Sequence, residues 1–135
     1  RVINCMIDSY VLANDNSVAF TSMGQLNYLS ALQFVDAVVG NSSSGLLEAP
    51  SFNVATIDIG DRQKGRIKAE SVISCLPEKK HIDNALKKIY SQHFQEVVKN
   101  VKNPYGDGGA SEIIFDTIKN FNLDNIIKKT FYDLQ

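Results

Sequence analysis

A run of small polar residues, set between an apolar run and a group of helix formers, is the stretch best suited to chemistry. Val38 and Val39 precede Gly40-Asn41-Ser42-Ser43-Ser44-Gly45, and Leu46-Leu47-Glu48-Ala49 follow. This order is typical of a buried strand, a tight turn and the start of a helix. Small side chains let a ligand approach the backbone, and the first N–H groups of a helix have no intrahelical partner. With the helix dipole, these donors favour an anion.

The side chains of this run, which we call the serine loop (residues 40–45), admit two interpretations. The serines could add hydroxyl donors for a phosphate, and Glu48, about one turn into the helix, could accept a hydrogen bond from a sugar or ribose hydroxyl. Alternatively, Ser42 or Ser43 merely caps the helix, since serine is a favoured N-cap residue. No lysine of the Walker type follows the turn. The segment alone leaves both interpretations open.

A cluster of positive charge follows the next predicted strand, in residues 60–66, which we call the basic loop. It contains Arg62, Lys64 and Arg66, in a chain whose formal net charge is −1. A guanidinium beside a helix N-terminus can hold a phosphate bidentately. The alternative is a solvated loop paired with Asp58 and Asp61, which contributes little energy. Together with the serine loop, the cluster favours a ligand site.

Short strands alternating with helices predict an α/β fold with a Rossmann-like parallel sheet. We expect strands at 17–21, 34–39, 54–59 and an edge strand at 71–75, and helices at 1–13, 25–33, 44–52, 78–90, 91–99, from 110, and at 124–130. Right-handed crossovers bring the carboxyl ends of the strands to one edge, where such sheets bind ligands. We therefore expect residues 22–24, the serine loop and the basic loop to meet there.

Several residues are expected to be structural. Pro50 should lie near the end of its helix, because proline is unfavourable in a helix interior. Cys5 and Cys75 should be reduced core residues, and His81 and His93 surface or half-buried residues. On the helix from Ala110, one face should point inward, and it comprises Ile113, Ile114, Thr117, Ile118 and Phe121.

Composition narrows the function further. The chain of 135 residues is 44% hydrophobic and 21% charged, which is typical of a globular protein. Its near-neutral charge and the lack of aromatics in the basic loop argue against a nucleic-acid partner. No apolar run approaches a membrane span and no signal peptide opens the chain, so we expect a cytoplasmic protein that contacts no membrane. Metal-ligand spacing and a nucleophile elbow are absent, so we expect neither metal nor cofactor.

Three motifs in order resemble the hydrolysing UDP-N-acetylglucosamine 2-epimerases. They are Gly40-Asn41-Ser42-Ser43-Ser44-Gly45 with Glu48-Ala49-Pro50-Ser51-Phe52, then Ile59-Gly60-Asp61-Arg62-Gln63-Lys64-Gly65-Arg66, then Asn103-Pro104-Tyr105-Gly106-Asp107-Gly108. Those enzymes have two Rossmann-like domains of the glycosyltransferase-B type. The resemblance implies that residues 1–135 are a single, partial UDP-binding domain, without its first βα units and without the N-terminal catalytic domain. Arg1 already lies in a predicted helix, so we expect a piece of a longer protein.

The resemblance also implies residue roles. Ser42 and Ser43 match the pair that binds the UDP diphosphate, and Glu48 matches the carboxylate that holds the ribose. Arg62 matches the basic residue that faces the diphosphate and assists its departure, and Met23 matches a position that reads the uracil. The family reaction eliminates UDP to give a 2-acetamidoglucal, and hydration then yields N-acetylmannosamine, the precursor of sialic acid. The proton-transferring carboxylates lie outside this chain.

The sequence is compatible with three other functions. The substrate could be a related UDP-diacetamido sugar, the enzyme a retaining glycosyltransferase of the same architecture, or the chain a non-catalytic nucleotide-binding module. An exposed sheet edge and exposed apolar surface would also favour a homo-oligomer.

Overall fold

The computed structural model describes residues 2–124, 126 and 127. It divides into two compact units, Arg1–Tyr105 and Gly106–Gln135, which are described separately.

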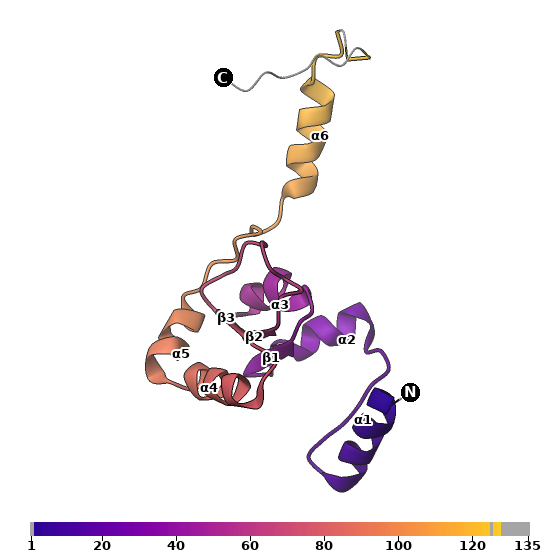
Figure 1. Ribbon diagram of the computed structural model, residues 1–135. Helices are drawn as coiled ribbons and strands as arrows, with labels where there is room; N and C mark the ends of the chain where they lie inside the picture. The colour runs from indigo at the N-terminus through magenta and orange to yellow at the C-terminus, as the bar shows by residue number, and fades with distance from the viewer. Residues whose placement is uncertain (1, 125, 128–135) are drawn as a thin grey trace. The chain divides into compact units, whose positions relative to one another are not determined.

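A three-stranded parallel sheet forms the centre of the first unit (Figure 1). Its strands are β1 (Ala37–Gly40), β2 (Ala55–Ile59) and β3 (Val72–Cys75), and they lie side by side in sequence order. This confirms the predicted α/β class and places β3 at an edge. β1 begins three positions later than predicted, because Phe34 N–H still donates to the Ala31 carbonyl in the turn that ends the preceding helix.

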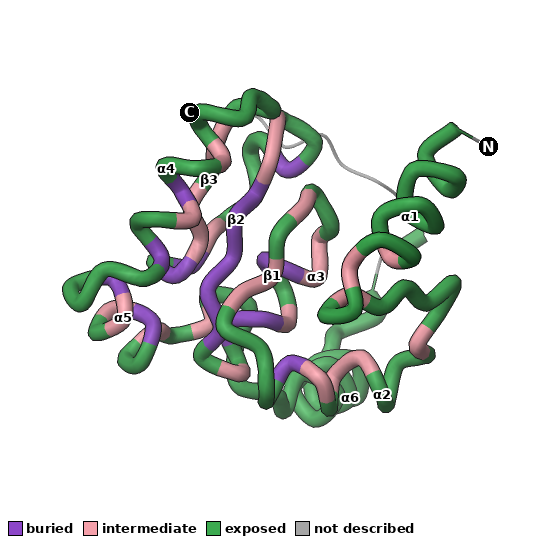
Figure 2. The backbone as a smooth tube through the Cα atoms, turned by 90° about the horizontal axis from the view of Figure 1, so that it is seen from below, coloured by how far each residue is buried: buried purple, intermediate pink, exposed green. Residues whose placement is uncertain are grey.

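The core lies between β2 and two amphipathic helices, α4 (Lys79–Ile89) and α5 (Gln92–Lys99). Side chains alternate along a strand, and those of Ala55 and Ile57 contribute to this cluster from one face of β2. Figure 2 shows β2 buried along most of its length, up to the half-buried Ile59 at its end. Ser91 is the N-cap residue of α5, and its hydroxyl accepts from Phe94 N–H at a long 3.4 Å. His81 and His93 are exposed on these helices, as expected.

The helix predicted for residues 44–52 is in fact two short turns, α3 (Ser44–Leu47) and the 3-10 helix η1 (Ala49–Phe52). The break has a local cause: Pro50 lies in the first turn of η1 and has no N–H with which to continue α3. Asn53 then ends η1 in the left-handed conformation, with φ of 54°. The dipole of so short a helix is correspondingly small.

The strand predicted for residues 17–21 is wrong. These residues form no strand, and Val18 and Phe20 are 76% and 65% exposed. A strand needs a neighbour for its N–H and C=O groups, and no described strand pairs with this segment. The flanking helices α1 (Val2–Ala13) and α2 (Gly24–Ala31) form as predicted but bury no residue. Cys5 is exposed on α1, which corrects its assignment to the core.

The second unit contains α6 (Ala110–Asn120). The helix is present as predicted, but the face expected to point inward is exposed, with Ile113 and Ile118 at 68% and 70%. A single helix cannot bury its own apolar face. The helix predicted for 124–130 falls largely outside the described residues, which here are Asp124, Ile126 and Ile127, all in turns.

Gly45 should be essential to the packing of α3 on the sheet. A Cβ at this position would lie 2.5 Å from Thr56 Cγ2. We expect Gly45→Ala to lower the free energy of unfolding by about 1–3 kcal/mol, although alanine favours helix. Thr56→Ser removes that methyl and keeps the hydroxyl that donates to the Gly45 carbonyl, so Gly45→Ala combined with Thr56→Ser should recover part of the loss. Urea denaturation measures both; a Gly45→Ala variant as stable as the parent would contradict this packing.

Candidate functional site

The serine loop and the basic loop meet at the carbonyl of Asn41. Arg62 Nη1 donates a hydrogen bond to this oxygen at 2.9 Å, and Gln63 Nε2 donates to it at 2.6 Å. A guanidinium from one loop therefore lies against the backbone of the other. Two of the three loops predicted to converge are thus in contact.

The strand pairing explains this contact. β1 and β2 run parallel, with Gly40 beside Asp58, so both strands end at the same edge. Gly60 has φ of 85°, which a residue with a side chain adopts only at a cost, and it turns the chain immediately after β2. The connection from β2 to β3, residues 60–71, contains no helix, and the basic loop is its first part, beside the serine loop.

Several donors in the serine loop are free of protein acceptors. Ser43 is at the N-cap position of α3, but its side chain makes no capping hydrogen bond. Ser42 Oγ accepts from Ser44 N–H only at 3.4 Å, the outer limit for such a bond. In the described part of the chain, the N–H groups of Ser43 and Gly45 donate to no protein acceptor. Capping of α3 therefore explains little of why this loop is rich in serine.

The third loop, residues 22–24, is not joined to the serine loop by any hydrogen bond of the described residues. The Ser22 hydroxyl accepts from Gly24 N–H at 3.2 Å, and half-buried Met23 precedes α2. The link from α2 comes instead from Tyr28, whose hydroxyl is hydrogen-bonded to that of Ser44. A role for Met23 stays a prediction.

Glu48 lies at the junction of α3 and η1, where it is half-buried. Its carboxylate makes no hydrogen bond and no ion pair with the described residues. It is therefore free to accept hydrogen bonds from another molecule, which leaves its predicted role open.

Asp58 is not a partner of the basic loop. Its carboxylate, 1% exposed, pairs with Lys68 Nζ at 2.7 Å, and the same ammonium donates to Ser74 Oγ at 2.6 Å. Among the described ion pairs none involves Arg62, Lys64 or Arg66. The alternative interpretation of the basic loop, in which its cations pair with Asp58 and Asp61, therefore loses Asp58 as a partner. Lys68 was not among the predicted site residues, because its role depends on the burial of Asp58, which calls for a counter-charge.

Cys75, at the end of β3, lies close to this ion pair. Burial raises the pKa of its thiol, and the negative charge of Asp58 adds to the rise. The thiol is therefore protonated at neutral pH. Half-buried against the core, Cys75 fits the structural role predicted for it.

Asn103 and Tyr105 form hydrogen bonds with the elements on both sides of the site. Asn103 Nδ2 donates to the Leu47 carbonyl at 2.8 Å and to Ser51 Oγ at 2.7 Å. The Tyr105 hydroxyl donates to the Ile67 carbonyl at 3.0 Å, just after the basic loop. This segment thus fixes α3 and the basic loop together, a function that its turn-forming composition did not reveal.

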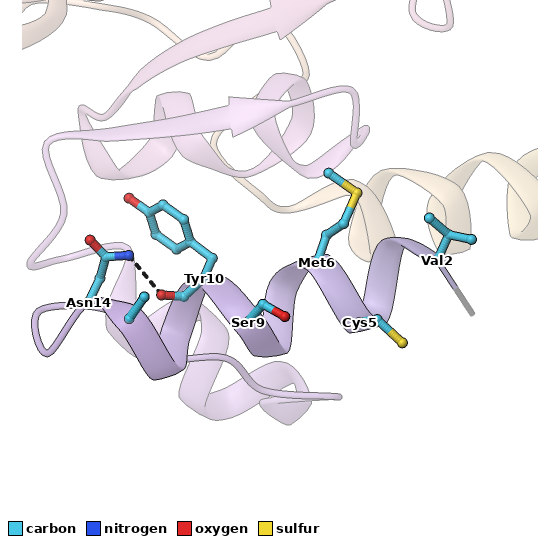
Figure 3. A pocket seen from close by; sticks show the side chains of 7 residues that line it. Val2, Cys5, Met6, Ser9, Tyr10 and Asn14 are labelled. Atoms are coloured by element: carbon cyan, nitrogen blue, oxygen red, sulfur yellow. Dashed lines mark hydrogen bonds between the residues drawn. The ribbon is translucent and has the colours of Figure 1, made fainter.

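An apolar hollow lies along α1 and is lined by none of the residues predicted to bind. Figure 3 shows its lining, which includes Val2, Met6 and Tyr10. The amide of Asn14 donates to the Tyr10 carbonyl and so caps the helix. The lining has no charged group, so this hollow does not suit a phosphate. The described residues hold no cluster of metal-ligating side chains, and none of their helices is long and apolar enough to cross a membrane.

Residues 1–119 match the family model of the UDP-N-acetylglucosamine 2-epimerases. The chain belongs to this family. It is 40% identical over 135 residues to a GDP/UDP-N,N'-diacetylbacillosamine 2-epimerase (hydrolyzing) of Campylobacter jejuni, an alignment that covers 98% of the chain and 35% of that relative. It is also 43% identical to the polysialic acid biosynthesis protein P7 of Escherichia coli, over 80% of the chain and 28% of the relative.

A further relative, the UDP-N-acetylglucosamine 2-epimerase of Neisseria meningitidis, is 37% identical over 58% of the chain. The chain thus spans about a third or less of the length of these relatives.

The Lys68–Asp58 pair should stabilise the end of β2. We expect Lys68→Met to lower the free energy of unfolding by about 3 kcal/mol, since it leaves a buried carboxylate without its counter-charge. Lys68→Met combined with Asp58→Asn should be more stable than Lys68→Met alone. Lys80, exposed on α4 and in none of the described ion pairs, gives a matched control as Lys80→Met. Equal denaturation midpoints for Lys68→Met and Lys80→Met would contradict this.

Proposed function

We propose that this chain is the UDP-binding part of a hydrolysing UDP-N-acetylglucosamine 2-epimerase. In this proposal residues 1–135 belong to one domain that holds the nucleotide. The complete enzyme converts UDP-N-acetylglucosamine and water into N-acetylmannosamine and UDP, by elimination to 2-acetamidoglucal and then hydration. Family membership and the contact between the two loops support this function.

The observation that carries the proposal is the hydrogen bond from Arg62 to the Asn41 carbonyl. It uses one of the five N–H donors of the guanidinium and leaves the others, which can bind phosphate oxygens. In the elimination, negative charge develops on the departing diphosphate. The Arg62 guanidinium, the serine hydroxyls and the free N–H groups stabilise that charge.

The remaining roles follow from the same arrangement. Ser42 and Ser43 donate to the diphosphate from their hydroxyls, supported by the unpaired N–H groups of the serine loop. Glu48 accepts hydrogen bonds from the ribose hydroxyls. Met23 contacts the uracil through its backbone. Because α3 has only four residues, local donors rather than the helix dipole provide most of the attraction.

A UDP-diacetamido sugar is the second candidate substrate. The 40% identity to the Campylobacter jejuni relative, across nearly the whole chain, favours it. The sugar would be chosen by residues beyond those of the nucleotide site. Incubation of the complete polypeptide with each UDP-sugar, followed by product analysis, separates the two candidates.

Arg62→Ala in the complete polypeptide should weaken UDP binding about tenfold to hundredfold, because it removes charge-assisted hydrogen bonds worth about 1.5–3 kcal/mol. Isothermal titration calorimetry measures the affinity. Lys80→Ala removes the same charge from the exposed face of α4 and should leave the affinity unchanged. Similar affinities for the parent and the Arg62→Ala variant would refute the assignment.

The 135-residue chain expressed alone should release no UDP from UDP-N-acetylglucosamine, because the proposed proton-transferring carboxylates lie outside it. A coupled assay of UDP release measures this against the complete polypeptide. Turnover by the isolated chain at the rate of the complete polypeptide would show that the chemistry resides within these residues.

A further inference from the structure

We propose that Gln63 is a positioning residue, which holds the serine loop in the form that accepts a diphosphate. The inference rests on the proposed function, since it concerns the same site. Gln63 itself touches no substrate. It acts through the Asn41 carbonyl, which accepts a hydrogen bond from its Nε2 at 2.6 Å.

The burial of Gln63 distinguishes it from its neighbours in the basic loop. Its side chain is 2% exposed, whereas Arg62, Lys64 and Arg66 are exposed. Its backbone is fixed as well, because the Gln63 carbonyl accepts from Arg66 N–H at 3.3 Å. The reversed amide would place Oε1 against the Asn41 carbonyl, two acceptors in contact, so the Nε2 donor remains directed at Asn41.

The two donors to the Asn41 carbonyl therefore have different roles. Arg62 is exposed and charged, so its guanidinium can turn toward an anion and give up this bond. Gln63 is buried and neutral, so it keeps the bond whether or not a ligand is present. The serine loop thus retains its conformation when Arg62 engages the diphosphate.

The chemistry of the Gln63 side chain supports this difference in role between Gln63 and Arg62. Gln63 Oε1 is buried and has no partner among the described residues. Such a group costs about 1–3 kcal/mol relative to a satisfied one, so fold stability alone does not explain an amide here. A neutral donor is what the position requires: a carboxylate would repel both the Asn41 carbonyl and a diphosphate.

Gln63→Glu tests the inference through its dependence on pH. A protonated carboxyl can donate to the Asn41 carbonyl, whereas a carboxylate cannot; burial raises the carboxyl pKa above its ordinary value of about 4.3. The other titratable groups of the basic loop are Asp61, Arg62, Lys64 and Arg66, and the serine loop has none. The parent protein contains all of these, so its affinity at each pH corrects for them and for the titration of UDP itself.

UDP affinity is measured by calorimetry on the complete polypeptide at pH 5.5 and pH 8. Relative to the parent at the same pH, Gln63→Glu should bind nearly as well at pH 5.5 and at least about tenfold more weakly at pH 8, because the carboxylate donates no hydrogen bond and repels the diphosphate. Gln63→Met, which fills the same space without a donor, should bind about tenfold more weakly at both values.

Gln95 provides the matched control, because its Nε2 donates to the Ile89 carbonyl at 2.5 Å, between α5 and the end of α4. Gln95→Glu and Gln95→Met should lower stability in urea but leave the UDP affinity at the parent value. The inference would be overturned if the affinity of Gln63→Glu relative to the parent were the same at both pH values. Parental affinity in a folded Gln63→Met variant would also overturn it, and either result would leave the nucleotide site intact. A parent protein that binds no UDP would instead refute the proposed function.

Discussion

One backbone carbonyl, that of Asn41, accepts hydrogen bonds from two side chains of the neighbouring loop, and the candidate site depends on this interaction. It joins the loop that follows β1 to the loop that follows β2. Without it, the guanidinium and the serine hydroxyls would belong to two independent surface loops. With it, positive charge and unpaired donors occupy one small region, which is what binding of a diphosphate requires.

The sheet makes this contact possible. Parallel pairing of β1 with β2 brings their carboxyl ends together, and Gly45 allows α3 to pack closely on Thr56. The connection from β2 to β3 has no helix, so its residues are available to contact the serine loop. Asn103 and Tyr105 then fix both sides from a distant part of the sequence. The site therefore combines local loop geometry with long-range hydrogen bonds.

The sequence predicted those features that local patterns determine. The strands near 54–59 and 71–75 follow from continuous apolar runs, and α4 and α5 from helical periodicity. The position of Arg62 beside the serine loop followed from the rule that parallel strands end at one edge. The predictions of a strand at 17–21 and of an inward face on α6 were wrong for the same reason. Each pattern indicates an apolar surface that needs a partner, and the described residues offer none.

Residues whose role depends on a distant partner could not be found in this way. Lys68 became recognisable only with its buried partner Asp58, and Gln63 only with the Asn41 carbonyl. An uncharged glutamine between two basic residues gives no signal of burial. An interruption of the helix at Pro50 could have been predicted from the sequence, because proline cannot continue an α-helix. The split into α3 and η1 depends instead on backbone angles that the sequence does not determine.

The central proposal is that this site binds the pyrophosphate of a nucleotide. Its most direct test is to titrate the complete polypeptide with UDP and, separately, with uridine, at constant pH and ionic strength. If the claim is right, the diphosphate supplies most of the affinity, and uridine binds at least about a hundredfold more weakly, a difference of about 2.7 kcal/mol. Equal affinities for UDP and uridine would contradict it.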